Sequence, residues 1–222
     1  MRIRSFIIAY ALVLAIVLFA DRRPNPAQQD RYSHIVDLTD GQSDGKSAHG
    51  QNPAADSRTR IIAPNSLIPG TWTADQIPPE RLIAPLVVMD LNVAPPAQIS
   101  LDDIAAWETK HGAVPQGAVV AIRHRAGQQQ SPGEMPITDG AAQFLMDARY
   151  TTGFAIDDSA NLQSDRALAR QIALHGNYVV ETASHLAAIP ATGSLIIVAP
   201  EKAPPAKAKL RAAPVRVLAM VR

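Results

Sequence analysis

DSRTRIIAPNSLIPG, the stretch from Asp56 to Gly70, is the most informative part of this chain, because a short strand within it would place Arg60 and Ile62 on one face. In a β-strand, side chains two positions apart share a face, so Arg60 and Ile62 point the same way. Ile62 has no lone pair, and the guanidinium of Arg60 stays protonated and repels a cation. This face of the strand therefore supplies no ligand for a metal ion.

Composition limits the classes of function. The chain has 222 residues, of which 47% are apolar, a net charge of +1 and no cysteine. This length and apolar content predict one folded domain, and the balanced charge gives no reason to expect nucleic acid as a partner. The absence of cysteine excludes disulfides, thiolate-bound zinc and thiol catalysis.

Residues 1–20 are expected to form a signal peptide or an N-terminal membrane anchor. Arginines at positions 2 and 4 precede the apolar run Phe6–Ala20, and the sequence DRRP ends it. The run is shorter than the roughly 20 residues of a membrane-spanning helix and is typical of a signal-peptide core, with cleavage after Ala20. We therefore expect a protein that is exported, periplasmic or anchored by residues 6–20, with residues 21–32 as a linker.

Short apolar runs alternate with amphipathic stretches over the rest of the chain, which predicts a mixed α/β domain over residues 33–222. Strands are predicted at 33–38, 85–91, 118–122, 153–156, 178–180, 195–199 and 215–220, and helices at 100–111, 138–149 and 164–175. The first helix is the best marked, since Ser100 can cap it, acids follow in its first turn and Gly112 can end it.

The opening segment resembles the signature of the cyclase family, the metal-dependent amide hydrolases that include bacterial kynurenine formamidases. That signature reads H-x-G-T-H-x-D-x-P-x-H and continues into F-x-x-G, and Thr59, Pro64 and Gly70 keep its scaffold positions. Further blocks similar to the family are IVDLTD at 35–40, residues 66–91, 137–158 and 169–186, and PVR at 214–216. The resemblance implies the family's swivelling β/β/α fold, usually assembled as a homo-oligomer.

The resemblance also implies where metal ligands should stand, and other residues occupy most of those places. The family's ligand positions fall on Asp56, Arg60, Ile62, Ser66 and Ala169, and Asp40 replaces a further histidine. Glu181 matches the family's glutamate and is the one ligand that is kept. We expect the guanidinium of Arg60 to take over the charge of the lost ion in a bidentate pair with Glu181.

The remaining candidate residues are weaker. The six histidines, at positions 34, 49, 111, 124, 175 and 185, show no H-x-H or H-E-x-x-H spacing. Glu181 and His185 share a face if the chain is helical there, and with Asp56 they could form a rearranged metal site. Trp72 lies in a proline-rich loop and is a candidate pocket residue. Asp157 and Asp158 are adjacent at a strand end, where their side chains point to opposite faces.

Three functions stay open. In the first, the protein is a catalytically degenerate family member that binds a small molecule in an exported or membrane-tethered accessory role, without a cofactor. In the second, it is an active hydrolase of formamide or cyclic amide substrates, of the N-formylkynurenine type found in tryptophan catabolism, with zinc or manganese in a rearranged site. In the third, it has mainly structural duties.

Overall fold

The computed structural model describes residues 32–40, 59–91, 98–124, 135–158, 162, 166–202 and 212–222. The expected leader or anchor, nearly all of the linker, and Asp56 lie outside these ranges. Within them, none of the helices has the length and the apolar content needed to cross a bilayer. The compact unit to which the described elements belong runs from His34 to Arg222.

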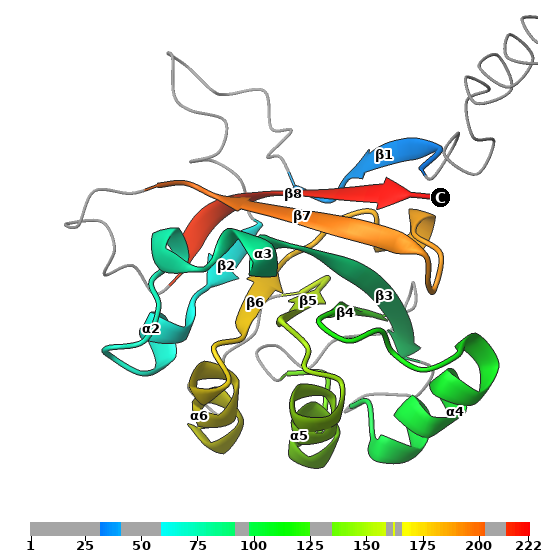
Figure 1. Cartoon of the computed structure of the whole chain (residues 1–222), viewed down its shortest axis with the longest axis horizontal. Helices are drawn as coiled ribbons and strands as arrows, with labels where there is room; N and C mark the ends of the chain where they lie inside the picture. The colour runs from blue at the N-terminus through cyan, green and yellow to red at the C-terminus, as the bar shows by residue number, and fades with distance from the viewer. Residues whose placement is uncertain are drawn as a thin grey trace, which may run out of the picture. The chain divides into compact units, whose positions relative to one another are not determined.

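A single sheet of eight strands closes into a barrel (Figure 1). The strand order is β1-β8-β2-β6-β5-β4-β3-β7, and a further pairing of β7 with β8 closes a ring of the seven strands other than β1. Strands β3, β4, β5 and β6 pair in parallel, and the other pairings are antiparallel. The strands are β1 (His34–Asp37), β2 (Arg60–Ile62), β3 (Ile83–Leu91), β4 (Val119–His124), β5 (Gly153–Ile156), β6 (Tyr178–Glu181), β7 (Ser194–Pro200) and β8 (Ala213–Val221).

Three helices lie together on one side of the sheet, along the parallel strands (Figure 1). They are α4 (Leu101–His111), α5 (Asp139–Ala148) and α6 (Arg166–Leu174); the shorter ones are α2 (Pro64–Leu67), α3 (Pro79–Leu82) and the 3₁₀ turns η2 (Ala74–Gln76) and η3 (Leu186–Ala188). Local signals explain the boundaries of α4, since the Ser100 hydroxyl accepts from the Asp103 N–H and Gly112 ends the helix with a φ of 86°.

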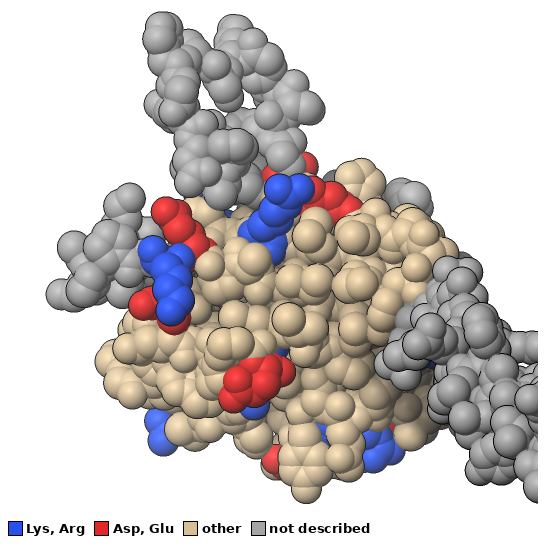
Figure 2. Space-filling model, turned by 45° about the horizontal axis from the view of Figure 1, so that its top comes forward, with Lys and Arg blue, Asp and Glu red and all other residues tan. Residues whose placement is uncertain are grey.

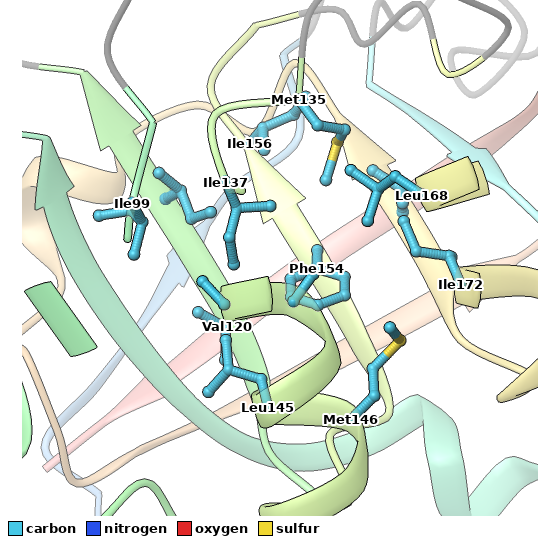
Figure 3. Packing of buried hydrophobic residues seen from close by; sticks show 14 of the residues in the cluster. Ile99, Val120, Met135, Ile137, Leu145, Met146, Phe154, Ile156, Leu168 and Ile172 are labelled. Atoms are coloured by element: carbon cyan, nitrogen blue, oxygen red, sulfur yellow. The ribbon is translucent and has the colours of Figure 1, made fainter. Parts of the chain in front are cut away.

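The alternation of side chains along the strands creates two hydrophobic cores. On β4, Val119 and Ala121 belong to the core inside the barrel, whereas Val120 and Ile122 belong to the core between the sheet and the helices. Figure 3 shows the second core, in which side chains of α5 and α6 converge on Phe154 of β5. We call it the helix-side core.

The opposite side of the barrel, over β7 and β8, carries an apolar face. Strand register aligns six of its side chains in two rows, Ile35, Met220 and Leu195 in one and Leu218, Ile197 and Ile83 in the other. Ile35 is 63% exposed and Ile83 is 56% exposed, and the other four are half-buried. Figure 2, with this side turned forward, shows a broad area that has few charged side chains.

The predicted α/β class is confirmed, and the predicted strands and helices appear with small shifts at their ends. The sequence did not predict the short helices α2 and α3 or the closure of the barrel. The expected N-terminal apolar helix has no support in the described residues.

Candidate functional site

The carboxyl ends of the parallel strands meet at one edge of the barrel, which is where open α/β sheets commonly bind ligands. Glu181 is the last residue of β6, and Asp157 follows directly after the end of β5. Strand β2 runs antiparallel to β6 and begins at this edge with Arg60. The fold therefore brings Arg60 of the quoted segment and Glu181 to the edge where a site is expected.

Arg60 and Glu181 stand opposite each other in the β2–β6 ladder. Directly opposed residues of an antiparallel pair project from the same face of the sheet. The two side chains nevertheless differ in environment, because Arg60 is exposed while Glu181 is only 9% exposed and has an interaction of its own. The ion pairs between described residues lie elsewhere, so the expected bidentate Arg60–Glu181 contact is not among them. A physical reason for the missing contact is that Arg60 is exposed at the first position of β2, where its guanidinium keeps its hydration.

Ile62 occupies the position at which the resemblance implies a carboxylate ligand. It is 1% exposed and belongs to the helix-side core, together with Ala169 of α6 and Val179 of β6. Its neighbours in that core are apolar, which suits an aliphatic side chain and would penalise a charged one. The core of the domain therefore includes this position.

Thr59 joins three segments at the edge of the site. Its side chain is buried, and its hydroxyl accepts from the Asp40 N–H at 2.7 Å and donates to the Thr182 carbonyl at 2.7 Å. Thr182 has a φ of 55°, which is unusual for a β-branched residue, and its N–H donates to the Asp158 carbonyl at 2.9 Å. These bonds fix the chain directly after Glu181. This hydrogen bonding explains the scaffold role that the resemblance implies for Thr59.

A pocket of about 460 Å³ lies beside the site, between α2 and α6. Ser66 of α2 and Ala169 of α6, which stand where the resemblance implies histidines, both line it. The structure thus brings these two positions together although they are far apart in sequence. Leu67, Ile68 and Leu162 also line the pocket, and Arg166 and Arg170 complete its wall.

His185 is not on a helical turn with Glu181. Glu181 ends β6, and His185, with a left-handed φ of 56°, precedes the 3₁₀ turn η3. His185 is exposed, and its Nδ1 lies 3.0 Å from the Ser184 hydroxyl and 3.1 Å from the Asp37 carbonyl oxygen. The helical spacing considered for a rearranged site is therefore wrong.

Trp72 lies at the other end of α6 from Arg166. The Arg81 guanidinium carbon is 5.6 Å from the centroid of its ring, and the ring packs so closely on Gly176 that a Cβ there would lie 2.9 Å from it. Trp72 is 38% exposed and is not one of the residues lining the pocket. This placement gives Trp72 packing contacts with the turn after α6.

The donor set at the edge does not fit the metal centre that the resemblance implies. The described ligand positions carry an exposed guanidinium, a core aliphatic side chain, a hydroxyl and a methyl group, with Glu181 as the one carboxylate. Throughout the described ranges, no group of three or more His, Cys, Asp or Glu side chains could hold a metal ion. Zinc and manganese sites use several imidazole and carboxylate ligands at once.

The sequence did not single out Arg166 and Arg170. Their spacing of four on a predicted helix places them on one face, which was the available signal. What the spacing alone does not reveal is that α2 packs against α6 and turns this face into a pocket wall.

The fold has several solved counterparts. An isatin hydrolase A from Labrenzia aggregata, solved with benzyl benzoate, is 24% identical with a TM-score of 0.63, and the match covers 85% of this chain and 93% of that one. An isatin hydrolase bound to the product analogue thioisatinate is 21% identical with a TM-score of 0.62, covering 100% and 99%. A potential metal-dependent hydrolase with cyclase activity is 22% identical with a TM-score of 0.60, covering 85% and 98%. At these identities the likeness establishes the fold alone.

The sequence itself also matches a family. No curated protein matches the chain. The family model described as "Putative cyclase" matches residues 36–160, which is more than half of the 222 residues and includes the end of β1, all of β2 and the Thr59 segment. The chain therefore belongs to the cyclase family.

Proposed function

We propose that this protein is a member of the cyclase family that does not hydrolyse amides through a bound metal and instead binds a small molecule. The observation that carries the proposal is Ile62, an aliphatic residue of the helix-side core at a position where the resemblance implies a carboxylate ligand. The protein would then keep the family's fold and bind a small molecule without hydrolysing an amide.

The chemistry of the replaced positions supports this proposal. Metal-assisted amide hydrolysis needs a cation that polarises the carbonyl and lowers the pKa of a bound water toward about 7. A side chain without a lone pair at position 62, a methyl group at Ala169 and a guanidinium at Arg60 cannot help to hold such an ion. Glu181 remains, but one carboxylate is fewer than the three protein ligands of a typical catalytic zinc site.

The competing function is an active hydrolase with a rearranged site built from Asp56, Glu181 and His185. The surroundings of His185 do not favour it, because this residue is exposed and its Nδ1 is close to two oxygens. The solved counterparts named as isatin hydrolases suggest a second substrate type, a cyclic amide, to test beside N-formylkynurenine.

A hydrolysis assay separates the two functions. The full chain, incubated with N-formylkynurenine or isatin and with manganese or zinc, is expected to give no turnover above the metal in buffer. The same assay with EDTA, and with the Glu181→Gln variant, is expected to give the same background rate. Turnover that EDTA and Glu181→Gln both abolish would show that the site is an active metal centre and would overturn the proposal.

A further inference from the structure

We propose that the pocket between α2 and α6 binds a small organic anion, a carboxylate carried on an apolar body, and that Arg166 and Arg170 hold the carboxylate. This inference rests on the proposed function, because it makes the former histidine positions Ser66 and Ala169 walls of a ligand pocket. It adds a ligand class and two binding residues to that function.

The size of the pocket suits such a ligand. Its volume of about 460 Å³ lies within the range of roughly 300–1,000 Å³ that is typical of small-molecule sites. Ser66 and Ala169 carry small side chains where the family has imidazoles, so the replacements leave space between the two helices.

Two positive charges face this space, and among the described residues neither forms an ion pair with a carboxylate. Arg166 and Arg170 are four residues apart on α6, so they lie on one face of the helix. Both are exposed, and none of the ion pairs between described residues includes either one. Like charges at this spacing repel each other, and a shared anion would turn the repulsion into two charge-assisted contacts.

Arg166 is the first residue of α6, and this position also favours a bound anion. Helices α4 and α5 have aspartates in their first turns, as the helix dipole favours, whereas α6 begins with Arg166 and has no acid in its first turn. Within the described residues of α6, no side chain supplies the negative charge that favours this end of a helix, and a carboxylate bound beside Arg166 would supply it.

The rest of the lining indicates that the anion has an apolar part. Leu67, Ile68, Leu162 and Ala169 provide aliphatic surface, and two of them, Leu162 and Ala169, belong to the helix-side core. An inorganic phosphate would leave this surface in contact with water. A ring or branched chain attached to the carboxylate would cover it, and burial of apolar surface favours binding.

Benzoate is a suitable probe because it combines a carboxylate with a compact apolar ring. Calorimetric titration of the full chain, in EDTA so that no metal can hold the carboxylate, is expected to show that benzoate binds. Benzamide, which has the same ring without the charge, and inorganic phosphate, which has charge without the ring, are each expected to bind at least about tenfold more weakly.

Two pocket variants and one control variant locate the site. Replacing both Arg166 and Arg170 with glutamine is expected to weaken benzoate binding by at least about tenfold, because charge-assisted hydrogen bonds to the carboxylate are lost. Arg222→Gln changes an exposed arginine at the C-terminus, outside the pocket lining, and is expected to leave binding unchanged. Ala169→Leu is expected to abolish binding by filling the pocket, and a thermal melt shows whether each variant is folded.

Unaltered benzoate affinity in the folded double glutamine variant would overturn the inference, as would an absence of benzoate binding. Benzamide or phosphate binding as tightly as benzoate would also overturn it, since the ligand class would then be wrong. Failure of this inference differs from failure of the proposed function, because the latter appears as EDTA-sensitive hydrolysis and the former as an absence of binding in EDTA.

Discussion

Replacing Ile62 with aspartate is expected to lower the free energy of unfolding by about 3–5 kcal/mol at neutral pH, the effect of an uncompensated charge in a protein interior. In relatives that follow the signature, a carboxylate here would serve a metal. In this chain Ile62 is 1% exposed within an apolar core, so the introduced carboxyl group would lose its hydration without gaining a partner.

The loss of stability in Ile62→Asp should depend on pH. Burial raises the pKa of a carboxyl group above its ordinary value of about 3.9 in the folded state. Between the unfolded pKa and this raised folded pKa, the folded state binds more protons, so the free energy of unfolding falls as the pH rises. The destabilisation should therefore be smallest in acid and largest above the raised pKa. Urea denaturation at a series of pH values measures it.

Two control variants define the effect of position 62. Ile62→Val removes one methylene group and should cost about 0.5–1.5 kcal/mol at every pH. Ile83→Asp places the same carboxyl group on a strand residue that is 56% exposed, where it should cost about 1 kcal/mol or less. Equal stability of Ile62→Asp and Ile62→Val would contradict the burial of this position in an apolar core. Restoration of the stability of Ile62→Asp alone by manganese or zinc would show that position 62 still belongs to a metal site.

Replacing Gly153 with alanine is the second change with a large expected effect. Gly153 of β5 pairs with Tyr178 of β6, and a Cβ on Gly153 would lie 2.8 Å from both the Tyr178 ring and the Tyr178 carbonyl oxygen. Tyr178 cannot easily move, because it is fully buried and its hydroxyl donates to the Arg81 carbonyl at 3.0 Å. Burial also raises the pKa of this hydroxyl, which keeps it neutral. Overpacking of this kind costs about 1–3 kcal/mol, and a clash with backbone places Gly153→Ala at the upper end.

Gly140→Ala makes the same chemical change at a position that can accept it. Gly140 lies near the start of α5, and the nearest atom to its added Cβ would be Leu101 Cδ1 at 3.7 Å. Alanine in place of glycine in a helix should stabilise the protein by about 0.4–1 kcal/mol. Thermal unfolding of the two variants should therefore shift in opposite directions. Equal shifts would contradict the packing described for β5 and β6.

Much of the fold could be predicted because its signals are local. Helix α4 illustrates this, since Ser100, Asp103 and Gly112 mark both ends within the helix sequence itself. The buried strands were also predictable, because runs such as those of β3 and β4 are apolar on both sides, as strands covered inside and outside must be. The closure of the barrel was not, because the pairing of β7 with β3 and β8 joins segments that no local pattern connects.

The candidate site was predicted in part. The alignment of the signature placed Arg60 near Glu181, and the β2–β6 register puts them opposite each other. The alignment did not reveal that Arg60 is exposed while Ile62 is buried. The burial of Ile62 depends on the helix-side core, to which α6 contributes. The pocket between α2 and α6 was missed for the same reason. Arg166 and Arg170 have the sequence pattern of ordinary surface charges, and only the packing of α2 against α6 makes them pocket residues.

Metal stoichiometry tests most directly whether the protein, with Ile62 at an implied ligand position, has lost the metal site. The full chain is incubated with manganese or zinc, separated from excess metal, and its metal content is measured by mass spectrometry beside that of Glu181→Gln. The predicted result is well below one metal ion per chain in both proteins. One tightly held ion per chain, lost in Glu181→Gln, would contradict the account.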